Sequence, residues 1–169
     1  MDDLRLELLE ERHLPAMTAL LDDPEVLRFT RVPEPPPEDF PRQWLDRYVE
    51  ARADGTAEAF AAVDGRGAFI GLALAPTIDR ESGEVELGYI VAQPARGRGV
   101  ATAMLAQLTA WAFGSVGAQR IVLIIDVRNP ASERVAERCG YTREGVMRSI
   151  HLKQGIRVDA ALWSRLPSD

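Results

Sequence analysis

Hydrophobic and polar positions repeat with two different periods along the first half of the chain. Residues 4–9 alternate as a strand does, whereas residues 13–21 and 40–54 repeat their apolar positions at helical spacing. Residues 57–63 and 68–75 follow as two strand-like segments, and the glycines of the turn between them predict a hairpin. The pattern therefore predicts a strand, two helices and two further strands.

In the second half of the chain, the period changes at one glycine-containing turn. Residues 84–91 alternate as a strand, and Val100, Met104 and Leu108 then recur at helical spacing. Residues 121–125 are all apolar, which suits a strand that is covered on both faces. A strand, a helix and a strand in this order predict a parallel pair joined by a right-handed crossover.

The last quarter of the chain carries clear boundary signals. Asn129 suits the N-cap of a helix and Pro130 its first position, while Gly140 suits the residue just beyond its end. Residues 141–152 and 156–166 alternate like strands, and the glycine between them can supply the positive φ of a turn. This part of the chain is therefore predicted to form a helix followed by a hairpin.

The turn at residues 96–99 has the chemistry of an anion site. Its glycines let the backbone approach a ligand closely, and the free N–H groups that open the next helix favour phosphate. The same glycines also fit a plain tight turn. A Walker loop is excluded because no Gly-Lys-Ser/Thr follows. A Rossmann fingerprint fits poorly, since Thr102 replaces a small residue and Asp126 lies too far along the chain.

Composition indicates one domain over residues 1–169. The chain has 169 residues, of which 46% are hydrophobic, enough for one sizeable core. Its longest strongly apolar run, residues 121–125, is far shorter than the ~20 residues of a membrane span, and its first residues do not resemble a signal peptide. The single cysteine, Cys139, cannot form an internal disulfide. We therefore expect a soluble protein of the cytoplasm, without a membrane partner.

Charge argues against a nucleic-acid partner. The formal net charge is −6, whereas nucleic-acid binders gather positive charge to neutralise phosphates. Residues 1–60 hold 15 acidic residues against 7 arginines, so the negative charge lies toward the front of the chain. These acids either form solvated helix faces or steer a cationic ligand toward a site.

Two segments together resemble one known family. Residues 96–101, which read Arg-x-x-Gly-x-Ala, resemble the pyrophosphate-binding motif of the GNAT superfamily of N-acetyltransferases. The second segment, residues 129–148, is similar to the second half of that domain, especially in its ribosomal-protein branch, and carries the residues Asn129, Pro130, Ala131, Ser132, Cys139, Gly140, Tyr141, Glu144, Gly145 and Arg148. The resemblance covers essentially the whole chain. It implies an α/β (α+β) fold whose mixed, mostly antiparallel sheet has about seven strands, is flanked by about four helices and is splayed at the cofactor-binding strand.

The resemblance implies acetyl coenzyme A as the acyl donor and no metal. The main-chain N–H groups of Ile90 and Val91 are the implied donors to the oxyanion of the reaction. Arg96 and Arg98 add charge suited to phosphate, although exposed surface arginines explain them equally well. The complete set of implied cofactor-binding residues is Ile90, Val91, Arg96, Gly97, Arg98, Gly99, Val100, Ala101, Asn129 and Ser132.

Acetyl transfer to an amine needs a base and a proton for the leaving thiolate. Glu86 is the candidate base, directly or through water, unless it is an ordinary charged residue on a solvent-facing strand. Ala136 stands where many family members carry a tyrosine that protonates the leaving thiolate. Ser132 is the substitute that the ribosomal-protein branch suggests, with solvent or a plain helix-start role as alternatives. Cys139 lies on an apolar helix stripe, so we expect core packing there and direct transfer in a ternary complex.

The acceptor is less well defined than the donor. A protein N-terminal α-amine is the first hypothesis, because its pKa near ~8 leaves part of it neutral. A small-molecule amine, such as an antibiotic or a polyamine, is the second, and a non-catalytic acyl-CoA sensor is the third. The proline-rich connector at residues 32–41 either borders the acceptor pocket or is a stiff spacer. We expect a monomer or a homodimer.

Overall fold

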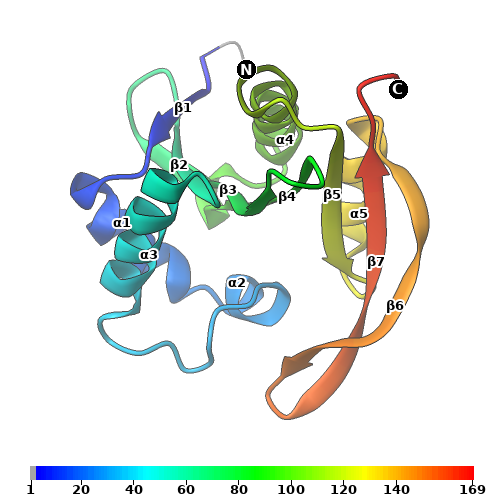
Figure 1. The fold of residues 1–169 in the computed structure, drawn as a ribbon. Helices are drawn as coiled ribbons and strands as arrows, with labels where there is room; N and C mark the ends of the chain where they lie inside the picture. The colour runs from blue at the N-terminus through cyan, green and yellow to red at the C-terminus, as the bar shows by residue number, and fades with distance from the viewer. Residues whose placement is uncertain (1–2) are drawn as a thin grey trace.

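Seven strands form one mixed sheet in the computed structural model, which describes residues 3–169 (Figure 1). The strand order is β1-β2-β3-β4-β5-β7-β6, and the β4–β5 pair alone is parallel. The strands are β1 (Arg5–Leu8), β2 (Glu58–Val63), β3 (Phe69–Asp79), β4 (Glu84–Val91), β5 (Arg120–Asp126), β6 (Thr142–Lys153) and β7 (Ile156–Arg165). The expected seven-stranded, mostly antiparallel sheet is confirmed.

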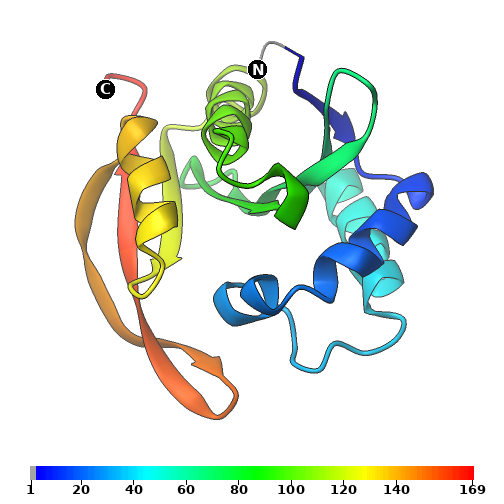
Figure 2. The ribbon, with the colours of Figure 1, turned by 180° about the vertical axis from the view of Figure 1, so that it is seen from behind.

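Among residues 3–169, five α-helices cover the two faces of this sheet, one more than the four expected. They are α1 (Leu14–Leu21), α2 (Pro24–Phe29), α3 (Phe40–Asp54), α4 (Val100–Trp111) and α5 (Pro130–Arg138). One core cluster joins α4 and α5 to the sheet, and a second joins α1, α2 and α3 to the opposite face. Figure 2 shows α4 and α5 together on the near side when the molecule is seen from behind.

The helix boundaries follow the signals in the sequence. Asn129 caps α5 by accepting a hydrogen bond from the Ser132 N–H at 3.1 Å, and Gly140 beyond the helix end has a φ of 76°. Met104 and Leu108 of α4 are fully buried, as the helical spacing predicts. The helix and hairpin predicted for the last quarter are therefore confirmed.

Two features differ from the sequence prediction. The short helix α2 was not predicted, although Asp23 accepts a hydrogen bond from the Glu25 N–H as its N-cap and Pro24 occupies its first turn. In addition, β3 runs to Asp79, four residues beyond the predicted end at Ala75. None of the helices in residues 3–169 has the length and apolar character needed to cross a membrane.

Candidate active site

The parallel strands β4 and β5 separate part-way along their length. They pair at only three positions, Glu84 with Arg120, Val85 with Ile121 and Glu86 with Val122. Beyond Glu86, β4 keeps its pairing with β3 but has no strand partner on the side of β5. The expected splay is confirmed, and it leaves an edge of β4 available to a ligand.

Two features of β3 lie beside the splayed part of β4. The register between the two strands shifts between Leu74 and Thr77, where Pro76 cannot donate a ladder hydrogen bond. Gly71 lies so close to β4 that a Cβ atom there would stand 2.3 Å from the Ile90 carbonyl oxygen. Glycine is therefore required at this position. The Ile90 main-chain groups face β3, so the expectation that its N–H meets the donor is wrong, and only Val91 of the two residues faces the open edge.

The turn between β4 and α4 has an open backbone. Gly97 and Gly99 have φ values of 71° and 77°, and a Cβ at Gly97 would meet no atom within 4 Å. Gly99 is the N-cap of α4 and offers no side chain to its first turn. The first N–H groups of an α-helix have no intrahelical acceptor, so those of α4 are free for an anion.

Arg96 makes contacts that the sequence did not reveal. Its Nη2 lies 2.6 Å from Asp23 Oδ2 and its Nη1 3.2 Å from Glu25 Oε2, while its Nε donates to the Val91 carbonyl at 3.1 Å. The guanidinium therefore joins the start of α2 to the end of β4. Arg98 is exposed and donates to the Pro94 carbonyl at 3.4 Å.

Glu86 lies on the opposite face of β4 from Val85 and Leu87, as predicted. Its carboxylate forms an ion pair with Arg31, and its side chain is 15% exposed against 55% for Arg31. Lys153 supports the segment that carries Arg31, because its Nζ donates to the Thr30 carbonyl at 2.7 Å and to the Val32 carbonyl at 3.1 Å.

These contacts join three distant parts of the chain around Glu86. The loop after α2 supplies Arg31, and the tip of the β6–β7 hairpin supplies Lys153. His151 of the same hairpin lies near them: burial lowers its pKa, Arg31 lowers it further, and Glu86 and Asp126 oppose the change. The lowered pKa favours the neutral imidazole.

Ser132 stands in the first turn of α5, directly after β5. The Asn129 N–H donates to the Asp126 carbonyl at 2.8 Å, which fixes the start of this helix. Burial alone would raise the pKa of Asp126, but hydrogen bonds from Arg128, the shortest at 2.6 Å, outweigh burial and hold that pKa below its usual value. The Asp126–Arg128 pair therefore supports the loop that positions Ser132.

Tyr89, which the sequence analysis did not select, faces α5 from the splayed part of β4. Burial raises the pKa of Tyr89 to about 12, and the adjacent Ser132 side chain opposes that rise. Strand alternation was a signal for this residue, because it placed Tyr89 on the same buried face as Val85 and Leu87.

The expected burial of Cys139 is confirmed. The residue is 8% exposed and its Sγ contacts the Thr102 carbonyl at 3.6 Å. Burial raises the pKa of the thiol. Among residues 3–169, no three His, Cys, Asp or Glu side chains are grouped so that they could hold a metal ion.

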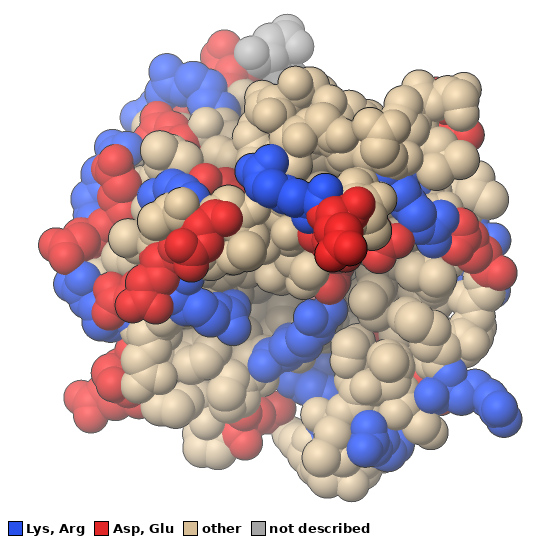
Figure 3. All heavy atoms as spheres, viewed as in Figure 1, with Lys and Arg blue, Asp and Glu red and all other residues tan. Residues whose placement is uncertain are grey.

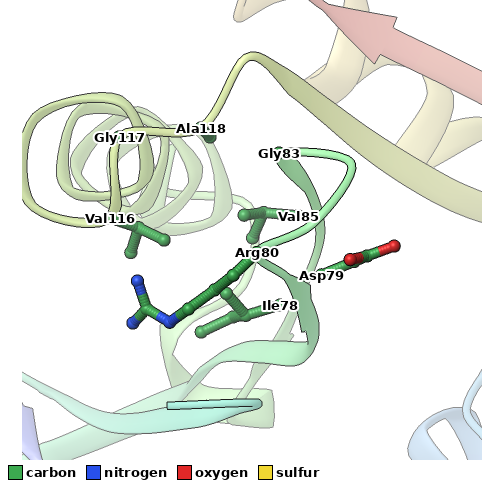
Figure 4. A pocket seen from close by; sticks show the side chains of 8 residues that line it. All are labelled: Ile78, Asp79, Arg80, Gly83, Val85, Val116, Gly117 and Ala118. Carbon is green, nitrogen blue, oxygen red and sulfur yellow. The ribbon is translucent and has the colours of Figure 1, made fainter.

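A small cavity lies at the other end of β4 (Figure 4). Its volume is about 80 Å³, and its walls come from the β3–β4 turn and from the segment after α4. Arg80 reaches across it toward Val116 in Figure 4. The cavity contains none of the expected site residues, so the splay and the glycine turn remain the candidate active site.

The comparisons with known proteins agree with this geometry. The sequence model of the family described as "Acetyltransferase (GNAT) domain" matches residues 3–142. Among curated proteins, one named as a ribosomal N-acetyltransferase, YdaF of Bacillus subtilis, is 29% identical over 59% of this chain and 55% of its own length. The uncharacterised N-acetyltransferase p20 of Bacillus licheniformis is 23% identical over 96% of this chain and 92% of its own.

Solved structures share the fold over nearly the whole chain. RimL, a ribosomal L7/L12 α-N-protein acetyltransferase in complex with coenzyme A, has a TM-score of 0.90 at 21% identity and covers 98% of this chain and 95% of its own. Spermidine N-acetyltransferase from Vibrio cholerae, in complex with CoA and spermine, has a TM-score of 0.89 at 23% identity. The match covers 99% of this chain and 98% of its own. Since the family match spans most of the sequence, this chain belongs to the GNAT family of N-acetyltransferases.

Proposed function

We propose that this protein transfers an acetyl group from acetyl-CoA to the α-amino group of a protein N-terminus, by direct transfer in a ternary complex. The observation that carries the proposal is the ion pair between Glu86 and Arg31. Glu86 is the last residue of β4 that pairs with β5 before the two strands separate. This pairing provides one base for one amine, and the nearby Asp126 is already paired with Arg128.

The donor site fits the diphosphate and pantetheine of acetyl-CoA. Gly97 and Gly99 open the backbone of the turn, and the first N–H groups of α4, at Val100 and Ala101, are suited to a diphosphate. The unpaired edge of β4 offers the Val91 N–H to the pantetheine, whereas the Ile90 main chain pairs with β3. Arg98 is exposed beside this turn, whereas the charge of Arg96 is already matched by two carboxylates.

Each step of the proposed reaction uses groups of this chain. When bound, acetyl-CoA supplies an activated acetyl thioester. Glu86 takes a proton from the amine, directly or through water, and the Val91 N–H on the open edge of β4 stabilises the oxyanion. Ser132, in the first turn of α5, is the candidate hydroxyl for the leaving thiolate. The buried Cys139 thiol stays protonated, which supports direct transfer over an acyl-enzyme.

The charges around Glu86 favour an acceptor with one amine. Arg31 neutralises Glu86, Arg128 neutralises Asp126, and Lys153 adds a further cation to the segment beside them. A polyamine needs several uncompensated carboxylates, whereas an α-amine with a pKa near ~8 needs only one base. Figure 3 shows a hollow in the same face as Figure 1, with both basic and acidic side chains around it.

The proposed acceptor also bears on where the protein works. Protein N-termini and acetyl-CoA are both found in the cytoplasm, and an unpaired cysteine suits a reducing compartment. We therefore propose a cytoplasmic enzyme that acts as a monomer or a homodimer, with an amine acceptor as its partner.

Thiol release from acetyl-CoA tests the function directly. Purified protein is assayed with peptides that have free α-amines, with the same peptides blocked at the N-terminus, and with spermidine and an aminoglycoside. We expect release with free peptides and a loss of it in Glu86→Gln. Turnover of spermidine but no peptide would replace the proposed acceptor. Calorimetric binding of CoA without turnover of any amine would indicate a sensor.

A further inference from the structure

The Tyr89 hydroxyl is a buried polar group that the proposed reaction does not use. Among residues 3–169, it is one of four buried side-chain polar atoms without a hydrogen-bond partner. A buried hydroxyl without a hydrogen-bond partner destabilises the fold, and phenylalanine would fill the same space without that cost. A tyrosine that keeps such a hydroxyl therefore calls for a physical reason.

The position of Tyr89 points to the departing thiol. Tyr89 lies three residues beyond Glu86, the last β4 residue paired with β5, so its backbone is in the splayed segment. Its side chain packs into the core cluster that contains Ala136 and Cys139. Ala136 is fully buried and carries no hydroxyl, so the helix offers no acid at the position where many relatives have a tyrosine.

Ser132 is the polar side chain that faces this hydroxyl. It approaches Tyr89 closely enough to lower the pKa of the phenol, but the two side chains do not meet hydrogen-bond geometry. Cys139 is the other titratable neighbour, and it raises that pKa. The Asn129 cap fixes Ser132 at its backbone, which leaves the Ser132 hydroxyl free to rotate.

We propose that Tyr89 and Ser132 form a hydroxyl pair that delivers a proton to the departing thiolate, with Tyr89 as the positioning residue behind Ser132. This inference rests on the proposed acetyl transfer. When the carbon–sulfur bond breaks, its electron pair stays on sulfur. The Ser132 proton moves to that sulfur and the Tyr89 proton moves to Ser132. Water then restores the Tyr89 proton, while Glu86 releases to solvent the proton that it took from the amine.

The acidities of the two hydroxyls support this order. A phenol is a much stronger acid than the alkyl hydroxyl of serine, even when burial raises the pKa of Tyr89 to about 12. Serine alone would be left as an alkoxide after donating its proton, whereas the pair leaves the negative charge on the phenol oxygen. The phenol is also fully protonated at neutral pH, so it is available as a donor in every turnover.

Three variants test the pair: Tyr89→Phe, Ser132→Ala and the double variant. Each single change is expected to lower kcat about 10²-fold, the lower end of general acid catalysis, with the acetyl-CoA KM little changed. The double variant should lose no more than the larger single loss, since the two groups act as one unit. The solvent deuterium isotope effect on kcat should fall in Tyr89→Phe to the value of Ser132→Ala.

Tyr141→Phe is a matched control for loss of structure. Tyr141 is buried with a pKa also raised to about 12, but its hydroxyl bonds Thr109 Oγ1 at 2.7 Å. Tyr141→Phe should lower the free energy of unfolding and leave kcat unchanged. Tyr89→Phe should lower kcat and leave the free energy of unfolding unchanged. Wild-type kcat in Tyr89→Phe, or losses that multiply in the double variant, would overturn the pair. A wild-type protein that turns over no amine would instead refute the proposed function.

Discussion

The Glu86 carboxylate forms an ion pair with Arg31, a residue 55 positions earlier in the chain. Arg31 comes from the loop after α2 and is more than half exposed, so it can leave without disturbing the core. A cation already stands beside the proposed base, and the incoming amine must displace it. The pair therefore links acceptor binding to the position of one loop.

Removing this cation should strengthen binding of the acceptor. In Arg31→Ala, we expect the KM for a peptide amine to fall by up to about fivefold, since exposed ion pairs contribute ~0–1 kcal/mol. The kcat should stay within about twofold, because Arg31 takes no part in proton transfer. Steady-state kinetics with varied peptide measure both, and Arg66→Ala in the exposed β2–β3 turn is the control. A higher KM in Arg31→Ala would show that Arg31 binds the acceptor.

The open glycine turn offers a second prediction with a matched control. Gly97→Ala and Gly67→Ala both place alanine at a positive φ, 71° and 78°, with no atom within 4 Å of the new Cβ. Each should lose about 1–2 kcal/mol in the free energy of unfolding, the cost of a left-handed conformation. Only Gly97→Ala should also raise the Kd for CoA, by about tenfold, because it adds a methyl group where the backbone meets phosphate.

Urea denaturation and calorimetric titration with CoA separate these two effects. Equal loss of stability with unequal loss of CoA affinity supports the turn as the diphosphate site. Equal CoA affinity in the two variants would place the diphosphate elsewhere.

The link between Arg96 and Asp23 should matter for stability. Arg96→Ala leaves the Asp23 carboxylate, whose side chain is 13% exposed, without its partner at 2.6 Å. We expect the free energy of unfolding to fall by about 1–3 kcal/mol, the cost of a polar group left unsatisfied. Asp23→Asn removes the charge but keeps a good N-cap for α2, so it should cost less. A double-mutant cycle measures the coupling, and a value near zero would mean that Arg96 is free for phosphate.

Most helices and strands could be predicted from the sequence, because the residues that begin, end or pattern them are close together along the chain. The α5 boundaries follow from Asn129, Pro130 and Gly140, and strand alternation placed Glu86 opposite Val85. The six-residue α2 carries similar signals at Asp23 and Pro24, but it is too short for a helical repeat to show.

Contacts between distant segments could not be predicted in the same way. The splay beyond Glu86 was expected only from the family resemblance, and the ion pair with Arg31 joins residues 55 positions apart. Neither has a local signal in the sequence, because the partners lie far apart along the chain. The unpartnered Tyr89 hydroxyl becomes visible only when its neighbours are placed around it.

The network around Arg120 predicts a specific response to acid. Arg120 joins Glu84 of β4, with its Nε 2.8 Å from Oε2, to Glu144 of β6, with its Nη atoms 2.7 Å from both carboxylate oxygens. Ser164 of β7 adds a hydrogen bond to Glu144 at 2.6 Å. Hydrogen bonds from Arg120 and then Ser164 lower the pKa of Glu144 to about 2.

This lowered pKa contributes stability above the ordinary glutamate pKa of about 4.5, and the contribution is lost as the pH falls toward 2. In Glu144→Gln, the free energy of unfolding should be lower than wild type at pH 7, and the difference should shrink between pH 5 and 2. Urea denaturation at several pH values measures this, with the exposed Glu137→Gln on α5 as the control. A difference that stays constant across this range would mean that folding does not change the pKa of Glu144.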